Sequence, residues 1–293
     1  MSLFLTQVLS GIQDGAIYAS LAIALVLVFK TTGILNFAQG EMALFSTYLV
    51  WKFTDLGIPV WISIILGMAL SFVGGALIER VVIRPVEGSP PLVIVIVTIG
   101  LFLALNSVTQ FVFGSGQRAV PAFYAHKVWR PGGVLISSDT LVLVSVLAIE
   151  CGLLFLLLNR TKLGLAFRGV ASNPESSRLL GVPVGRILMV GWGLAAAVGC
   201  LAGALVVPTT AGLVPSSMQG ILVFAFAAAA LGGFDSVFGA VVGGMIVGIA
   251  DALTTGYIHA LQGIDIIVPF GLILLVLLFR PAGLFGTTHV ERV

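Results

Sequence analysis

The sequence predicts an all-α integral membrane protein, a polytopic bundle of about eight or nine transmembrane helices. Only 9% of its 293 residues are charged, whereas an average soluble domain carries about 25%. Apolar residues make up 59% of the chain, and the mean hydropathy is +1.17. Charge-free stretches lie between Asp55 and Glu79, between Glu87 and Arg118, and across residues 187–234. Because these stretches are continuously apolar rather than alternating, they favour helices over strands.

Nine apolar segments account for most of the chain. In order they span 5–29, 38–53, 57–78, 90–113, 139–158, 187–207, 217–231, 237–257 and 265–279. A crossing helix needs about 20 apolar residues, so the second and seventh segments are short and could be tilted, broken or re-entrant. The first segment follows no basic region and shows no convincing cleavage site, so we interpret it as a membrane helix rather than a signal peptide. We expect one transmembrane domain over residues 1–293.

The positive charges predict which loops face the cytoplasm, because short cytoplasmic loops carry an excess of Lys and Arg. With nine crossings and the N-terminus outside, ten of the fourteen basic residues are cytoplasmic: Lys30, Arg80, Arg84, Arg160, Lys162, Arg168, Arg178, Arg186, Arg280 and Arg292. The opposite orientation would place only four there. We therefore expect loop 159–186 in the cytoplasm and loop 114–138 outside. A re-entrant second segment would move the N-terminus but not these later loops, so the side of the N-terminus stays open.

The inner loop, 159–186, contains a start signal for a short helix. Ser172 with Glu175 three residues later fits a capping box. Asn173 followed by Pro174 offers the alternative, with Asn at the N-cap and Pro at the first helical position. Either choice begins a helix at nearly the same place.

The end of this helix is specified as well. Gly181 suits the left-handed position after a helix, and Pro183 prevents continuation. The segment 172–183 is therefore predicted to form about two turns, and isolated helices that short are marginal in water. It needs a partner surface, which could be lipid headgroups or a cleft in a cytoplasmic protein.

The spacing of Glu175 and Gly181 resembles the EAA signature of ABC importer permeases, in which these two residue types lie in a short coupling helix. Ser176 and Ser177 stand where the family usually has two Ala, a departure that conserves small size. The resemblance implies that the residues coupling the chain to an ATPase are Arg168, Pro174, Glu175, Arg178, Leu179 and Gly181.

Further motifs resemble the branched-chain amino acid permeases of the LivH and LivM type. They occur in family order from near residue 11 to residue 286, at 15–19, 33–41, 83–85, 98–100, 161–168, 231–236 and 279–286. Each motif is modest alone, but together they are specific. The absence of an extended N-terminal region leads us to expect the LivH-like half of the pair.

This resemblance to the high-affinity branched-chain amino acid ABC importer family implies a non-catalytic permease subunit of the bacterial cytoplasmic (inner) membrane, forming half of a translocation pathway. The implied partners are a second, LivM-like permease, two cytoplasmic ATP-binding subunits, an extracytoplasmic solute-binding protein and membrane lipid, with no nucleic acid. The implied solute is a branched-chain or other neutral amino acid, with urea or amides as alternatives. No G-x-x-x-x-G-K-[ST] motif occurs in the chain, so the ATPase would be separate.

Polar side chains inside apolar segments are candidates for the substrate pathway, because such groups are costly in a bilayer. The richest stretch, 31–41, could be an unwound connection lining a cavity. The alternative is an ordinary interfacial turn, with Asn36 as N-cap and Gln39 and Glu41 in the first helical turn. The candidate pathway residues are Asn36, Gln39, Glu41, Thr98, Asn106 and Asp251.

Two groups of residues have competing structural interpretations. Asp14, Glu150 and Asp251 lie in or near apolar segments with no Lys or Arg in the middle of the same segments, and each could be purely structural. Four G-x-x-x-G pairs predict close helix packing, either within the bundle or at a subunit interface: Gly11/Gly15, Gly199/Gly203, Gly239/Gly243 and Gly244/Gly248. We expect Cys151 and Cys200 to be small packing residues, and we expect no metal site and no cofactor.

Three other functions are alternatives to an importer subunit. A stand-alone secondary transporter or channel would use Glu41, Glu150 or Asp251 for proton coupling and rest loop 159–186 on lipid. An intramembrane enzyme needs a nucleophile–base or metal constellation at membrane depth. The three histidines lie in loops, the tail or a segment end: His126, His259 and His289. A purely structural subunit would share the same composition.

Overall fold

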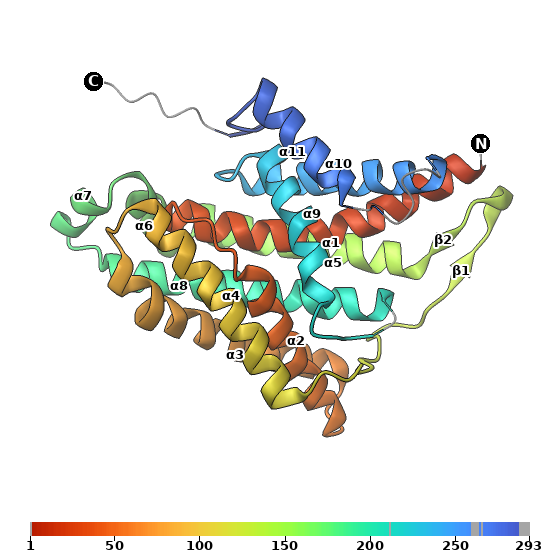
Figure 1. Cartoon of the computed structure of the whole chain (residues 1–293), viewed down its shortest axis with the longest axis horizontal. Helices are drawn as coiled ribbons and strands as arrows, with labels where there is room; N and C mark the ends of the chain where they lie inside the picture. Colours follow the sequence, from red (N-terminus) through yellow and green to blue (C-terminus); the bar gives the residue numbers. More distant parts are fainter. Residues whose placement is uncertain (1, 211, 259–263, 265, 287–293) are drawn as a thin grey trace. The chain divides into compact units, whose positions relative to one another are not determined.

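The computed structural model describes residues 2–210, 212–258, 264 and 266–286, and most of them are helical (Figure 1). The nine apolar segments correspond to α1 (Ser2–Thr32), α2 (Gln39–Asp55), α3 (Val60–Ile78), α4 (Pro91–Phe113), α5 (Ser138–Arg160), α8 (Val184–Val206), α9 (Ser217–Gly232), α10 (Val237–Tyr257) and α11 (Ile267–Phe279). Within the described residues, six helices are long and apolar enough to cross a membrane. The predicted all-α polytopic fold is confirmed.

The second and seventh segments are short, as predicted. Helices α2 and α9 have 17 and 16 residues. At 1.5 Å per residue each is about 25 Å long, which is less than the roughly 30 Å hydrocarbon core. Helix α1, by contrast, has 31 residues, so it can extend beyond the core.

The two long loops contain more structure than the sequence predicted. Loop 114–138 holds a small antiparallel hairpin of β1 (Val128–Trp129) and β2 (Ile136–Ser137). Loop 159–186 holds two helices, α6 (Lys162–Ser172) and α7 (Pro174–Leu179), of which only the second was predicted. His259, His289 and Arg292 lie outside the described residues.

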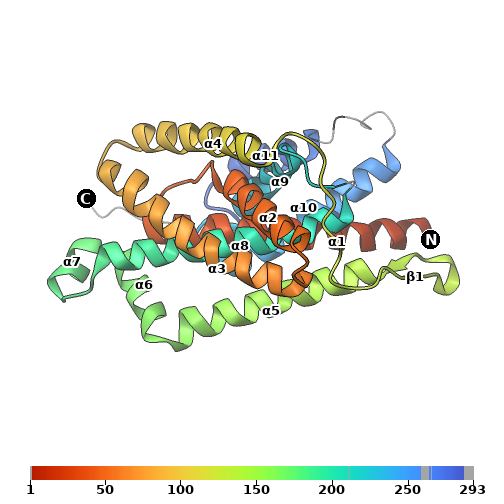
Figure 2. The same ribbon diagram turned by 90° about the horizontal axis from the view of Figure 1, so that it is seen from below.

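The described residues form two compact units, and the second comprises ranges 27–124 and 148–219. In this unit α8 packs against both α2 and α3 (Figures 1 and 2). A buried cluster of Val50, Ile64, Cys200 and Ala204 joins the three helices. Cys200 is fully buried here, as expected of a packing residue.

Within the described residues, the first unit comprises ranges 2–26, 125–147, 220–258, 264 and 266–286. Here α1 and α10 approach closely through glycines. A Cβ at Gly11 would lie 2.6 Å from the Cα of Ile249, and one at Gly15 would lie 2.9 Å from the carbonyl oxygen of Gly244. A Cβ at Gly248 would overlap the backbone of Gly11 and Gly15. These glycines pack inside the chain, so for them the G-x-x-x-G pairs serve packing within the bundle rather than a subunit interface.

The other two pairs also pack within the chain. Gly199 and Gly203 on α8 face side chains of α2, and Gly239 and Gly243 on α10 face the backbone of α9. The small residues thus let neighbouring backbones approach, as is common between membrane helices.

Gly248→Ala is expected to destabilise the protein, because the added methyl group meets backbone atoms that no rotamer change can move. Overpacking of this kind costs typically about 1–3 kcal/mol. The matched control is Gly220→Ala on α9, where an added Cβ meets nothing within 4 Å. Thermal unfolding in detergent should show a lower Tm for Gly248→Ala and an unchanged or higher Tm for Gly220→Ala. Equal Tm values for the two variants would contradict the close crossing.

Candidate functional site

Helix α7 has the capped structure that its sequence predicts. The Asn173 side chain caps it, because Oδ1 accepts a hydrogen bond from the backbone N–H of Ser176 (2.8 Å). Pro174 occupies the first helical position. The alternative capping box is wrong, since Ser172 is the last residue of α6 rather than a cap of α7.

The end of α7 is a Schellman motif. Gly181 has φ +81, the left-handed conformation that Gly adopts most easily. Its N–H donates to the carbonyl of Arg178 (3.0 Å), and the N–H of Val182 donates to the carbonyl of Ser177 (3.0 Å). Six residues are thus held in a defined helix.

Helix α6 anchors α7 to the second unit. Thr161 caps α6 by accepting a hydrogen bond from the N–H of Gly164 (3.1 Å). Phe167 and Val170 are buried against a hydrophobic cluster at the start of α8. The sequence does contain a signal for α6 that was not used in its prediction. The spacing of Leu163, Phe167 and Val170 places three apolar side chains on one helical face.

The surface of α7 points away from the rest of its unit. Leu179 is 89% exposed and the neighbouring Leu180 is 84% exposed. Glu175, Arg178 and Gly181 are also exposed. Two large apolar side chains are thus uncovered at the C-terminal end of α7. Exposed apolar patches are typical of interaction sites.

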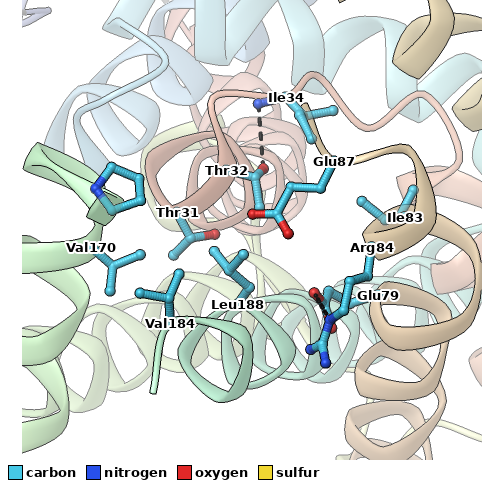
Figure 3. A pocket seen from close by; sticks show the side chains of 11 residues that line it. Thr31, Thr32, Ile34, Glu79, Ile83, Arg84, Glu87, Val170, Val184 and Leu188 are labelled. Atoms are coloured by element: carbon cyan, nitrogen blue, oxygen red, sulfur yellow. Dashed lines mark hydrogen bonds and ion pairs between the residues drawn. The ribbon is translucent and has the colours of Figure 1, made fainter. Parts of the chain in front are cut away.

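The base of α7 borders a small cavity of about 70 Å³ (Figure 3). Glu79 in the π-helical turn η1 (Glu79–Ile83) and Arg84 in the 3-10 turn η2 (Arg84–Val86) lie on one side of it. Val170 of α6 and Pro174 of α7 line it as well.

Arg84 joins the segment after α3 to the start of α8. Its Nε donates to Oε1 of Glu79 (3.2 Å), and its Nη2 donates to Oε2 (2.7 Å). The same Nη2 donates to the backbone carbonyl of Gly185 (2.7 Å). The Glu79 side chain is only 1% exposed, so its charge depends on this partner. We call Glu79, Arg84 and Gly185 the clasp.

The other predicted coupling residues have different surroundings. Arg178 lies 3.9 Å from Glu87 in an exposed ion pair. Arg168 turns back toward α5, where its Nη1 donates to Oδ1 of Asn159 (3.2 Å). Arg168 therefore lies on α6, not on the exposed surface of α7.

The stretch between α1 and α2 is an unwound connection, which was one of the two interpretations of residues 31–41. Residues 33–38 are not helical, and Gly33 has φ +68. The N-cap position of α2 is Ala38 rather than Asn36. Asn36 lies two residues earlier, and its Oδ1 accepts a hydrogen bond from the N–H of Ala38 (3.0 Å). Gln39 and Glu41 do lie in the first turn of α2.

One buried and one partly buried polar cluster involve this connection and the first turn of α2. In the first, Asn36 Nδ2 donates to Gln39 Oε1 (3.1 Å), and Gln39 Nε2 donates to the carbonyl of Ala195 on α8 (3.0 Å). In the second, Asn106 Nδ2 on α4 donates to Glu41 Oε2 (2.9 Å), and Gln219 Nε2 on α9 reaches Glu41 Oε1 (3.4 Å). Four of the six predicted pathway residues thus fall in these two clusters, Asn36 and Gln39 in the first and Glu41 and Asn106 in the second.

The other two predicted pathway residues lie outside these clusters. Thr98 is buried on α4, where its hydroxyl donates to the carbonyl of Val95 in its own helix (2.9 Å). Asp251 lies in the first unit and lines a larger pocket together with Asp14 of α1. Gln219 was not predicted, and only its hydrogen bond to a residue 178 positions away reveals it.

These features define a polytopic membrane protein that buries amides and a carboxylate among its apolar helices, as transport proteins do. The family model of the branched-chain amino acid transport system / permease component matches residues 7–277. The chain belongs to this family, which confirms the resemblance found in the sequence motifs.

Curated relatives match over nearly their full length. The high-affinity branched-chain amino acid transport system permease protein LivH of Escherichia coli K12 is 31% identical, with 99% of this chain and 98% of the relative covered. BraD of Pseudomonas aeruginosa, with the same description, is also 31% identical over 99% and 98%. A probable LivH of Methanocaldococcus jannaschii is 30% identical over 94% and 92%.

Family membership settles the class of protein. The chain is a non-catalytic permease subunit of an ABC importer and a multi-pass protein of the inner membrane. Permeases of this kind work with ATPase and solute-binding partners. The rival interpretation, a stand-alone secondary transporter, is not favoured.

Proposed function

We propose that the chain forms half of the translocation pathway of an importer for branched-chain or other neutral amino acids. The near full-length similarity to permeases named for branched-chain amino acid transport carries this proposal. The proposed complex contains a second, LivM-like permease, two cytoplasmic ATPases and an extracytoplasmic solute-binding protein.

In this proposal α7 is the coupling helix and faces the cytoplasm. Leu179 and Leu180 would insert into a cleft of the ATPase, with Glu175 and Arg178 at the rim. ATP binding would close the ATPase pair and move α7 with its cleft. Because α7 is fixed at both ends by caps, it would move as a rigid element.

The cavity at the base of α7 gives this movement a route into the membrane helices. It is bordered by Thr31 at the end of α1, by Arg84 after α3 and by Leu188 on α8. A displacement of Pro174 would therefore reach three membrane helices at once. Coupling would thus pass through a contiguous network of packed side chains.

We further propose that these two polar clusters line or border the pathway. The first joins Asn36 and Gln39 to α8, and the second joins Asn106 of α4 to Glu41 of α2. Asn36, Gln39 and Glu41 are fully buried among apolar helices, which is costly, and such groups in transporters commonly face the solute route. Thr98 remains a weaker candidate, because its hydroxyl is already bonded within its own helix.

The proposed function is tested by reconstituting the chain in proteoliposomes with a LivM-like permease, ATPases and a solute-binding protein. We expect uptake of radiolabelled leucine only when ATP and liganded binding protein are both present. Liposomes that contain this chain without the ATPases are the control and should show no uptake. Leucine uptake by the chain alone would contradict the proposal and favour a secondary transporter. Uptake of urea or an amide in place of leucine would correct the solute.

A further inference from the structure

A group of aromatic side chains joins the last turns of α2 to the end of α4 in the second unit. The ring of Tyr48 on α2 stacks on that of Phe113, the last residue of α4, with centroids 5.1 Å apart and planes inclined by 18°. The ring of Trp51 is nearly perpendicular to both, and its centroid lies 6.4 Å from each. We call Tyr48, Trp51 and Phe113 the aromatic cluster.

The side chain of Arg118 is held against this cluster. Its guanidinium lies over the ring of Trp51, with Cζ 4.8 Å from the ring centroid, a distance at which cation–π attraction operates. Its Nη2 donates a hydrogen bond to the backbone carbonyl of Phe113 (3.0 Å). The backbone of Arg118 exchanges two hydrogen bonds with Leu213 in the loop before α9 (2.9 and 2.8 Å). The guanidinium therefore has a fixed position at the end of α4.

Two hydrogen-bonding groups at this place are buried without a partner. The Tyr48 side chain is 0% exposed, and its hydroxyl bonds to none of the described residues. The Nε of Arg118 is buried from solvent and also has no acceptor in the described part of the chain. Buried polar groups are nearly always paired, because an unpaired one loses its hydration without compensation. Since both side chains contact Trp51 and Phe113, an acceptor that enters this cluster can serve both.

The aromatic cluster lies on the same face of α2 as the second polar cluster of the proposed pathway. Glu41 and Tyr48 are two helical turns apart, which places them on one face and about 10 Å apart along the axis. Asn106 and Phe113 have the same spacing on α4, and each contacts its counterpart on α2. Because loop 114–138 is expected outside, a solute that enters from there reaches the aromatic cluster before it reaches Glu41.

We propose that Tyr48 and Arg118 form a carboxylate-binding site at the outer end of the translocation route, where both donate hydrogen bonds to the carboxylate of the transported amino acid. The inference rests on the proposed function for the identity of the solute. Guanidinium groups make strong, directional hydrogen bonds to carboxylates. One carboxylate has enough lone pairs to accept from both donors, and the aromatic cluster offers apolar surface to an aliphatic side chain.

The site has to open before a carboxylate can enter, because the Tyr48 hydroxyl is covered in this conformation. The segment that carries Arg118 has the features of a hinge. Gly114 follows the end of α4 with φ +78, and an added Cβ at Gly116 would meet nothing within 4 Å. Hinges commonly consist of a few residues at the end of an element. In the proposal, release of the two hydrogen bonds to Leu213 lets this segment move and admits the solute.

Tyr48→Phe isolates the proposed role, because it removes a hydroxyl that bonds to no described residue. We expect an unchanged or higher Tm in detergent, since a buried unpaired group is lost. We expect leucine uptake by the reconstituted complex to fall about tenfold or more, since a hydrogen bond to a charged group is lost. ATP hydrolysis stimulated by liganded binding protein should stay near the wild-type rate, because α7 is untouched.

Ser46→Ala is the matched control. It removes a buried hydroxyl from the opposite face of α2, where this hydroxyl donates only to backbone carbonyls of its own helix among the printed distances of 2.8 and 2.9 Å. Leucine uptake by this variant should equal that of the wild type. Wild-type uptake by Tyr48→Phe as well would overturn the inference.

The second test measures binding without transport and uses two fragments of leucine. 4-Methylpentanoate retains the carboxylate and lacks the amino group, whereas isopentylamine retains the amino group and lacks the carboxylate. Tryptophan fluorescence is the readout, because Trp51 lies against the guanidinium, and a signal that disappears in Trp51→Phe comes from this residue. In the purified permease pair we expect a saturable change with 4-methylpentanoate and none with isopentylamine.

Arg118→Gln should weaken the response to 4-methylpentanoate about tenfold or more, because the charged donor is lost. Three results would each overturn the carboxylate site: no response to 4-methylpentanoate, an equal response to isopentylamine, or a response that Arg118→Gln leaves unchanged.

The two tests separate the inference from the proposed function. If the wild-type complex does not transport leucine, the proposed solute is wrong, while the fluorescence titration still decides whether the site binds carboxylates. If the wild type transports leucine and Tyr48→Phe transports it equally well, the function stands and the carboxylate site is rejected.

Discussion

Leu179→Asp together with Leu180→Asp is expected to abolish co-purification of the ATPases with the permease and, with it, all ATP-dependent uptake. The two side chains are 89% and 84% exposed, so the change removes no contact inside the chain. Burying a Leu side chain in a partner contributes about 1.5–3 kcal/mol. Losing two such contacts therefore weakens the complex by roughly a hundredfold or more, and the new carboxylates would also have to be desolvated in an apolar cleft.

The control for this pair is Leu56→Asp. Leu56 is 65% exposed and follows α2, in a loop that the charge distribution predicts to lie on the opposite side of the membrane. The same chemical change there should leave ATPase co-purification intact. Equal thermal unfolding of both variants would show that folding is preserved. Retention of the ATPases by the Leu179–Leu180 variant would contradict the assignment of α7 as the coupling helix.

The side of the membrane on which α7 lies can be measured directly. In a chain whose Cys151 and Cys200 are replaced by Ala, a single cysteine at Ser176, on the exposed surface of α7, should react with a membrane-impermeant maleimide in inside-out vesicles but not in intact cells. Docked ATPase should slow this reaction. Reaction in intact cells would place α7 outside and would contradict the orientation predicted from the basic residues.

The sequence predicted those parts of the fold that depend on local information. Hydropathy located all nine apolar helices, because a helix in lipid must satisfy its own backbone and cover it with apolar side chains. The start and end of α7 were also predictable, since Asn173, Pro174 and Gly181 act on neighbouring backbone groups. The choice between two possible caps was open, and only the path of α6 decided it.

The parts that sequence reasoning missed depend on contacts between distant residues. Asn106 bonds to Glu41 across 65 positions, and Arg84 bonds to Gly185 across 101 positions. No local spacing encodes such pairs. Asp14 was recognised only as an isolated carboxylate, because its pocket exists only once α1 and α10 cross through their glycines. The polar face of Ser10, Asp14 and Tyr18 was the signal that could have marked it.

Arg84→Ala is expected to destabilise the protein strongly. It removes the ion-pair partner of Glu79, a carboxylate that is 1% exposed, and leaves the carbonyl of Gly185 without this donor. Removing one partner of a buried ion pair typically costs about 3–5 kcal/mol, because an uncompensated charge stays behind. Thermal unfolding in detergent should show a large drop in Tm. Arg178→Ala is the matched control, since its pair with Glu87 is longer (3.9 Å) and exposed and should contribute at most about 1 kcal/mol.

A double variant separates the stability of the clasp from its role in coupling. Glu79→Gln with Arg84→Gln removes both charges and should regain most of the lost stability, because no buried charge is left unpaired. It should nevertheless retain the ATPases and hydrolyse ATP while transporting less solute per ATP, since the bidentate link from η1 to the start of α8 is gone. If the clasp only stabilised the fold, the double variant would regain transport together with its Tm. The measured ratio of leucine uptake to ATP hydrolysis therefore decides whether Arg84 transmits the movement of α7 or only holds the helices in place.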